Sequence, residues 1–348
     1  MSPAPISYSK FYGRKFQLTV TAANGTVFQF PAASNQPDNL RIVFNIFTVF
    51  YQVYWWADID IYNLDQFTST ALIQSAGTTQ PYVKQGMTAI LSAGYQQGNY
   101  GIIWQGPVFQ ARVTRENVTD FKISLHCLLS IDPLTRDAVN SSYSASQSQT
   151  GLIQKMANLA FGSSVPVTIS SSAKVVNQSR GGVIFGTVKS TFDNFADENN
   201  MQWFVSQRGL NFAKIDDDTP ATDTSASVFS PPNAPGQQPP EADGIIIGTP
   251  EQTQYGVRFR VLLDPTVVVK YPAQLVNINN SQIVMQKRAI GEYLNVLDQN
   301  GTYIVFGVRY YGDTRGQAWY TEIDGLTSVG GKWAAAQLIA AANAARNH

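Results

Sequence analysis

The sequence predicts a mainly β protein with a smaller α+β part and a helix near its C-terminal end. Two blocks of alternating, aromatic-rich β pattern, residues 16–129 and 245–326, bracket a middle segment of different character. The middle segment combines helical spacing with a stretch rich in Pro, Ser and Asp. Since no crossover helix separates the strands of the first block, an antiparallel barrel or sandwich is expected there.

The first block begins with a hairpin, because residues 16–20 and 27–30 alternate in polarity around the turn signal Asn24-Gly25. Residues 67–76 are compatible with a short helix or a loop. The other strands of this block follow the same two-residue period and are predicted at residues 39–48, 57–64, 87–95, 101–105, 108–114 and 120–129.

The middle segment predicts a small α+β unit. Residues 137–150 are polar and small, which indicates a loop or hinge. Residues 151–161 carry apolar side chains at helical spacing, and a second helix is expected at residues 190–199. A hairpin of residues 201–205 and 210–215 follows.

A linker and the second β block complete the chain. Residues 216–244 are of low complexity and rich in proline, which predicts an extended linker or an arm laid over a neighbour. An Ala-rich helix is expected at residues 333–345. The strands of the second block are predicted at residues 245–247, 256–263, 273–278, 293–297, 302–311 and 318–323.

These elements predict five parts of the chain. They are a first β domain (1–132), an α+β insertion (133–216), a linker (217–243), a second β domain (244–327) and a C-terminal helix (328–348). The two β blocks share an order of features, since each has an aromatic-Gly turn (Gly94, Gly312) before a Trp-bearing strand (Trp104, Trp319). An internal duplication and a chance recurrence of short β motifs both remain open.

The composition favours a structural role. Charged residues make up 14% of the 348-residue chain, below the roughly 25% of ordinary soluble domains, so much of the surface is expected to face partners. The formal charge is zero, which indicates no global attraction to a polyanion. We expect synthesis in the host cytoplasm and no membrane insertion, because the N-terminal stretch lacks an apolar signal core and no apolar run is long enough to span a bilayer.

The sequence contains little that could hold a metal or cofactor. The two histidines are His126, in a predicted strand, and His348, at the last residue. The acidic run 216–218 lacks the spacing and glycine of a calcium loop, so a solvated linker start is the better interpretation. The single cysteine, Cys127, lies in an apolar run and is expected to be a buried small hydrophobe. We therefore predict no metal site, no cofactor and no catalytic residue.

Two further groups of residues are candidates for a functional site. Glu322 and Asp324 share a face near a strand end and are the only candidates for the carboxylate pair of a glycoside hydrolase. A surface strand end is the alternative interpretation. Lys10, Arg14 and Lys15 form a basic patch with interleaved aromatic residues, for which packing of an arm against a neighbour is favoured over phosphate binding.

Several strings occur together in an order that resembles a known family. DNLRIVFNI, ADIDIYNL and ILSAGYQQGNYGIIWQGPV resemble the first β domain of baseplate hub proteins of contractile-tailed bacteriophages, the trimeric tail hubs of the T-even type. FGTVKSTFDNFADENNMQWFVSQRGLNFAKID looks like their small α+β unit. IIGTPEQTQYGVRFRVLLDP and VRYYGDTRGQAWYTEIDGL look like their second β domain.

The resemblance implies a fold and a function. The fold is two similar tail-tube-like antiparallel β-barrel domains flanking the helix-containing insertion. Such a hub is a non-enzymatic homotrimer in the virion baseplate, in which six similar β domains meet the sixfold tail tube and the opposite face accepts the threefold spike. The implied partners are the tube or tube-initiator protein, the spike, the tape measure protein and baseplate wedge proteins, and genomic DNA passes through without specific binding.

Two other functions remain open at this point. One is a distal tail or tube-initiator protein built from the same β module, for which a single module in a hexamer would be expected. The other is a carbohydrate-binding or peptidoglycan-degrading tail component, which would depend on Glu322 and Asp324.

Overall fold

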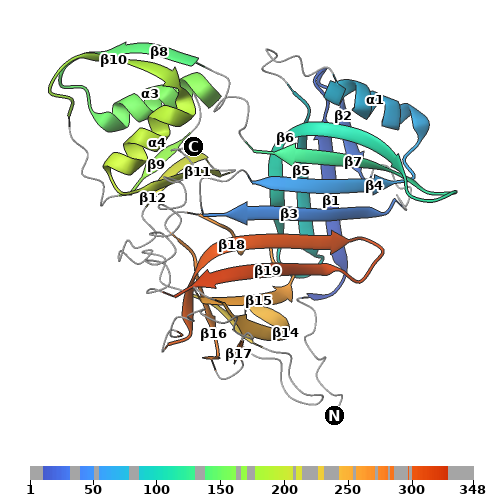
Figure 1. Cartoon of the computed structure of the whole chain (residues 1–348). Helices are drawn as coiled ribbons and strands as arrows, with labels where there is room; N and C mark the ends of the chain where they lie inside the picture. Colours follow the sequence, from blue (N-terminus) through green and yellow to red (C-terminus); the bar gives the residue numbers. More distant parts are fainter. Residues whose placement is uncertain are drawn as a thin grey trace, which may run out of the picture.

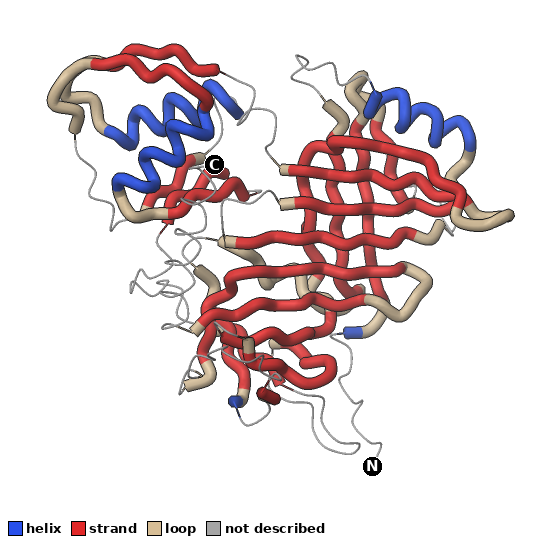
Figure 2. The backbone as a smooth tube through the Cα atoms, viewed as in Figure 1, coloured by secondary structure: helices blue, strands red, loops and turns tan. Residues whose placement is uncertain are grey.

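The chain, here a computed structural model, folds into one large sheet assembly with a smaller α+β unit beside it (Figure 1, Figure 2). A mainly β chain with a smaller α+β part is therefore confirmed. The structure describes residues 11–31, 40–50, 55–77, 86–129, 138–161, 166–170, 177–206, 209–213, 226–230, 243–253, 256–270, 273–280, 283–285, 297 and 300–327.

The first module is a sheet folded over on itself. Its long strand β6 (Tyr100–Arg115) joins the two layers, because its first half pairs with β5 (Thr88–Tyr95) and its second half with β7 (Phe121–Leu128). The other elements are β1 (Arg14–Thr21), β2 (Val27–Phe30), β3 (Ile42–Val49), β4 (Trp56–Tyr62) and helix α1 (Gln66–Gly77). The predicted hairpin is β1 and β2, and the segment left between helix and loop is α1.

Strand β6 corrects the prediction of two strands at residues 101–105 and 108–114. Pro107 is the last residue opposite β5, at a position where a strand tolerates a missing backbone donor. A β-bulge at Phe109 then turns the strand into the other layer, where it pairs with β7. The proline therefore bends the strand but does not end it.

The second module is a closed barrel. Its strands follow the order β16 (Leu275–Ile278), β13 (Ser227–Ser230), β14 (Gly244–Gln252), β15 (Gly256–Leu262), β19 (Trp319–Leu326) and β18 (Thr302–Asp313). The ring closes because β18 also pairs with β16. A two-residue strand, β17 (Val284–Met285), pairs with β14 beside the ring.

Strand β13 corrects the linker prediction for residues 217–243. It pairs in parallel with both β14 and β16, and Phe229 is buried with its ring centroid 5.7 Å from that of Phe259. Gly244 lies opposite Phe229, where a Cβ would come within 2.5 Å of the Phe229 ring. A four-residue strand between polar segments carries too short a pattern to be recognised in the sequence.

The two modules are joined edge to edge into one continuous sheet. Residues 307–313 of β18 pair antiparallel with residues 43–49 of β3, so Figure 1 shows the strands of both modules running side by side. At this joint a Cβ on Gly312 would overlap the Phe44 ring. The Arg309 guanidinium lies over the Phe47 ring, 4.7 Å from its centroid. A single hydrophobic core runs through both modules.

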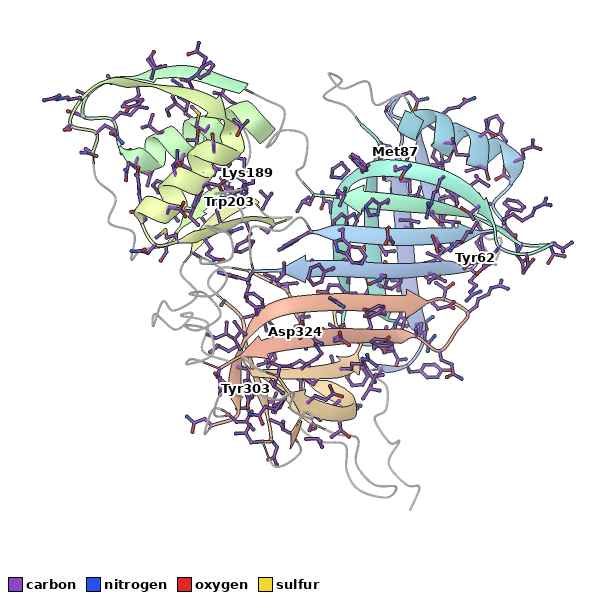
Figure 3. All side chains as sticks on the ribbon, viewed as in Figure 1. Tyr62, Met87, Lys189, Trp203, Tyr303 and Asp324 are labelled. Atoms are coloured by element: carbon purple, nitrogen blue, oxygen red, sulfur yellow. The ribbon has the colours of Figure 1, made fainter. Side chains whose placement is uncertain are left out.

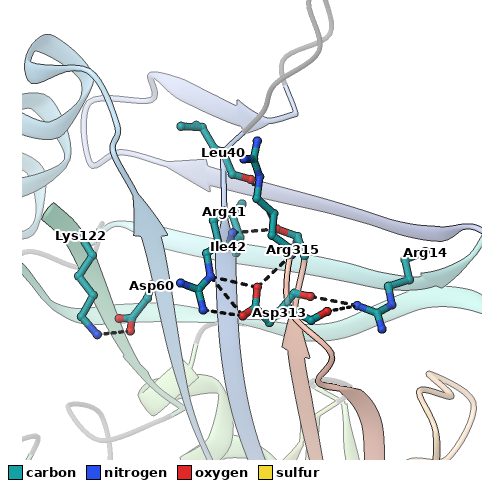
Figure 4. A network of polar contacts seen from close by, with 10 residues as sticks. Arg14, Leu40, Arg41, Ile42, Asp60, Lys122, Asp313 and Arg315 are labelled. Atoms are coloured by element: carbon teal, nitrogen blue, oxygen red, sulfur yellow. Dashed lines mark hydrogen bonds and ion pairs between the residues drawn. The ribbon is translucent and has the colours of Figure 1, made fainter. Parts of the chain in front are cut away.

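A cluster of polar contacts clamps one end of the joint (Figure 4). Arg41 donates two hydrogen bonds to the Asp313 carboxylate oxygen Oδ2, from Nη2 at 2.7 Å and from Nε at 3.2 Å. Arg14 of β1 donates to the carbonyl oxygens of Gly316, at 2.6 Å, and Gln317, at 3.1 Å. The turn after β18 is thereby tied to two strands of the first module.

The α+β unit has a hydrophobic core of its own, built from Met156, Phe192, Trp203 and Phe212 among others. The Asp193 carboxylate accepts hydrogen bonds from Trp203, at 2.9 Å, and Lys189, at 2.7 Å (Figure 3). The elements are β8 (Ala138–Tyr143), α3 (Gln149–Phe161), β9 (Val167–Ile169), β10 (Gly182–Thr187), α4 (Val188–Glu198), β11 (Gln202–Ser206) and β12 (Gly209–Ala213).

Both predicted helices and the predicted hairpin of this unit are confirmed as α3, α4 and the pair β11–β12. Helix α4 begins where the Thr187 hydroxyl accepts a hydrogen bond from the Ser190 N–H. The loop predicted at residues 137–150 is wrong in its first half, because β8 pairs there with β10. Serine and asparagine side chains gave β8 no apolar alternation from which to predict a strand.

One aromatic contact holds the α+β unit against the first module. The Phe204 ring of β11 lies between Phe50, at a centroid distance of 4.6 Å, and Trp55, at 6.0 Å. Several predicted features lie outside the described residues: the helix at 333–345, nearly all of the strand at 293–297, the acidic run 216–218, Lys10 and His348.

We expect Phe229→Ala to lower the free energy of unfolding by about 3–5 kcal/mol, because it leaves a cavity inside the barrel. The neighbouring exposed residue offers a control: Val228→Ala should change that free energy by less than about 0.5 kcal/mol. Denaturant unfolding measures both. Equal small effects would mean that β13 does not complete the barrel.

We expect Asp313→Asn to weaken the joint in a pH-dependent way. Burial disfavours the ionised carboxyl, but hydrogen bonds from Arg41 and from the N–H groups of Arg315 and Gly316 outweigh it, so the pKa of Asp313 lies below its usual value. A lowered pKa stabilises the fold above the ordinary carboxyl pKa, and this contribution is lost as the pH falls through the folded-state pKa.

The variant should therefore be less stable than the parent protein by about 1–3 kcal/mol at pH 7. The difference should begin to shrink below about pH 4, where the carboxyl of the unfolded chain takes up a proton, and should vanish once the pH has fallen through the lower pKa of folded-state Asp313. Unfolding curves at both pH values test this, and a difference that does not change with pH would contradict it.

Candidate functional site: the matched modules and the outer face of the sheet

The two modules have the same strand order. In the first, the order is β3-β4-β7-β6-β5-β1, and in the second it is β14-β15-β19-β18-β16-β13. Each position corresponds in chain order as well, apart from β2 and β17, which stand outside the match. The neighbours pair antiparallel in both modules, except that β13 runs parallel to β16 where β1 runs antiparallel to β5. The predicted similarity of the two β blocks is therefore confirmed for the order of their strands in the sheet and along the chain.

The correspondence extends to single residues. β4 pairs with β7 from Trp56 opposite Leu128, and β15 pairs with β19 from Gly256 opposite Leu326, over ladders of equal length. The bulges also coincide, because β6 skips one residue before Gln110 and β18 skips one before Gly307. In both cases the skipped residue is phenylalanine, Phe109 in β6 and Phe306 in β18.

The hairpin ends coincide in the same way. The Glu116 N–H donates to the Asp120 carbonyl at 3.0 Å, and the Asp313 N–H donates to the Ala318 carbonyl at 2.7 Å. Glu116, directly after β6, and Asp313, the last residue of β18, therefore occupy matched positions. Such agreement in register, bulge and turn favours an internal duplication over a chance recurrence of motifs.

The outer face, defined as the outward side chains of β15, β19, β18, β3, β4 and β7, carries four pairs of a carboxylate with a basic side chain, three of them with lysine or arginine. In the first module, Asp58 and Asp60 of β4 face His126, at 2.5 Å, and Lys122, at 2.6 Å, on β7. In the second module the acids and bases change strands. There the arginines stand on β15, at the positions that match Asp58 and Asp60. The carboxylates stand on β19, where Asp324 matches His126 and Glu322 matches Ser124.

This arrangement decides the role of Glu322 and Asp324. Arg260 Nε lies 2.8 Å from Glu322 Oε2, and Arg258 Nε lies 2.6 Å from Asp324 Oδ1. The hydrogen bonds to Asp324 and to Glu322 raise the pKa of Arg258 and of Arg260, respectively, so both carboxylates face permanent cations. The two carboxylates are therefore ion-pair partners on a strand (Figure 3 labels Asp324).

The arginines on β15 were not identified from the sequence, although a signal was present. R-F-R in β15 and E-I-D in β19 alternate with the same two-residue period and opposite charge. Opposite charges at equal spacing favour neighbouring strands, because cross-strand pairs of opposite sign are stabilising. The pairing itself spans more than 60 residues of chain.

The structure disperses the predicted basic patch. Arg14 is bound to carbonyl oxygens of the turn after β18, and the Lys15 ammonium lies 4.4 Å from the Tyr100 ring centroid. Both side chains are thus used inside the chain and not on an arm. Cys127 is buried as predicted, and this burial raises the pKa of its thiol.

Among the described residues, no three His, Cys, Asp or Glu side chains come together in a way that could hold a metal ion. In the same part of the chain, no helix is long and apolar enough to cross a membrane.

Comparison with known proteins identifies the fold. No protein-family model matches the chain, and no curated protein matches it by sequence. A tail protein from Neisseria meningitidis MC58 superposes with a TM-score of 0.53 at 11% identity, over 91% of this chain and 97% of that protein. The 43 kDa tail protein of prophage MuSo2 from Shewanella oneidensis gives 0.51 at 9% identity, over 91% of this chain and 98% of that protein.

At these identities the likeness concerns the fold alone. It includes both β modules and the α+β unit, since nearly the whole length of each chain is covered. This chain has the fold of these two tail proteins.

Proposed function

We propose that this protein is a non-enzymatic structural component of a phage tail, the central hub of the baseplate. In this proposal three copies form a ring that adapts the sixfold tail tube to the threefold spike and lines the channel for DNA ejection. The proposed domains are residues 1–132, 133–216, 244–327 and 328–348 with the segment 217–243 between them, of which β13 belongs to the second barrel.

The observation that carries the proposal is the duplicated module. The two modules have the same strand order, and they are joined edge to edge by the pairing of β18 of the second module with β3 of the first. Three such chains would present six near-equivalent modules on one face, as a sixfold partner requires, while the α+β units keep threefold symmetry. Repeated heterologous contacts of this kind close into a ring.

The proposed partners follow from this place in the virion. They are two further copies of the chain, the tube or tube-initiator protein, the spike, and the tape measure and wedge proteins. On the outer face Lys122, Arg258 and Arg260 each face a carboxylate, which neutralises their charge. A channel lined in this way would hold phosphates weakly and let DNA pass without specific binding.

The mass of the full chain in solution tests the proposal. We expect light scattering after gel filtration to give three times the chain mass of 38.2 kDa at high protein concentration, and electron microscopy to show a ring with a threefold axis. A hexamer of the chain would instead favour the tube-initiator function. A monomer at every concentration would contradict the hub.

A second measurement tests the carbohydrate-active alternative. We expect no cleavage of peptidoglycan by the protein, and no difference between the parent chain and Glu322→Gln. Cleavage that disappears in this variant would overturn the structural assignment, because it would require a free carboxylate where the structure has an ion pair with Arg260.

A further inference from the structure

One edge of the first module is open. The first half of β6 pairs with β5. From Phe109 to Arg115 the strand pairs with β7 on one edge, and no described strand pairs with its other edge. Helix α1 packs against β6 and still leaves Phe109 49% and Val113 47% exposed. A strand edge with unpaired backbone groups and apolar side chains is prone to pair with another chain.

The same edge in the second module is covered. β18 matches β6 residue by residue, and its second half is the part that pairs with β3. The chain therefore contains one complete example of the contact that this edge makes. The intact joint serves as a template for a partner of the open edge.

The template also identifies the partner strand. β3 corresponds to β14, the first strand of the same series in the second module. Two residues at the start of β14 pair with β13 and two at its end pair with β17. Between them, on the edge that faces away from β15, the stretch 246–250 has no partner strand among the described residues. Within this stretch Ile247 is 39% exposed.

We propose that the open edge of β6 and the turn that follows it bind β14 of a second copy of this chain, as β18 and its turn bind β3 within one chain. This inference rests on the proposed trimer and adds the strands that form its interface. Because the contact joins different surfaces of the two copies, it repeats around the ring until the ring closes.

The template predicts which residues meet. Asp313 lies opposite Val43 in the intact joint, and Glu116 occupies the position of Asp313 in the first module. Val43 lies opposite Asp60 of β4, and Ile247 lies opposite Arg260 of β15, at the matched position. Glu116 of one copy should therefore lie opposite Ile247 of the next.

The second joint differs from the first in its chemistry. The position of Arg41, directly before Ile42, corresponds to Ile245, so the ion pair to Asp313 has no counterpart. The turn of the hairpin instead presents Val118, which is 90% exposed. Asn117 accepts hydrogen bonds from the N–H groups of Thr119 and Asp120, which holds this turn in shape before a partner arrives.

Cysteine cross-linking of the full chain tests the assignment. Residues directly opposite on antiparallel strands have Cα atoms roughly 4.5–5.5 Å apart, within the range of a disulfide. We expect the double variant Glu116→Cys, Ile247→Cys to give a covalent trimer on a non-reducing gel after mild oxidation. A mixture of the two single variants should give covalent dimers and no trimer.

A control pair uses a distant exposed position. Glu116→Cys with Val183→Cys of the α+β unit should give no intermolecular cross-link above background, because β10 lies outside the template joint. Cys127 stays in place in all variants, since it is buried. Circular dichroism of each variant shows that it is folded.

A matched pair of substitutions gives an independent readout. Phe109→Asp places a charge on the open edge and should raise the concentration needed for trimer formation at least tenfold. Phe185→Asp places the same charge on a more exposed phenylalanine, of β10, and should leave this concentration unchanged.

The outcomes separate this inference from the proposed function. A trimer that forms without the Glu116–Ile247 cross-link, and that Phe109→Asp does not weaken, would overturn the β6–β14 joint and leave the hub assignment intact. A parent chain that stays monomeric at every concentration would overturn both.

Discussion

The antiparallel pairing of β18 with β3 is the contact on which the rest of the structure depends. Each module ends in a strand whose backbone N–H and C=O groups need partners. Pairing the two edges satisfies these groups, merges the hydrophobic cores and places both modules in one sheet with a common outer face. Gly312 permits the close approach to Phe44, and Arg41 with Asp313 holds the end of the joint.

The matched modules differ in charge although they agree in register. Carboxylates stand on β4 in the first module and on β19 in the second, and each has its cation on the neighbouring strand. Acid and base are exchanged between the matched pairs Asp58–His126 and Arg258–Asp324, whereas Glu322 takes the place of Ser124 and not of Lys122. The two modules therefore agree in strand order and register but differ in the charges that they carry on the outer face.

The matched edges of β18 and β6 also differ in whether another strand covers them. β18 is covered within the chain and is clamped by charged groups, so this joint forms with the fold itself. β6 is open, carries apolar side chains and lacks the clamp. A permanent joint inside the chain and an apolar joint between chains would let the protein fold first and assemble afterwards.

The sequence by itself determined the local elements and the class of fold. Strong two-residue alternation, as in Ile42, Phe44 and Ile46, and helical spacing in residues 151–161 and 190–199 predict strands and helices because each pattern reflects one buried face. Tertiary structure alone decided what these elements pair with. β13 and β8 are strands only because their neighbours supply hydrogen bonds, and Glu322 and Asp324 are ion-pair partners only because β15 lies beside β19. Strand pairing is long-range, so the residues that define the joint between the modules leave no mark within any short window of sequence.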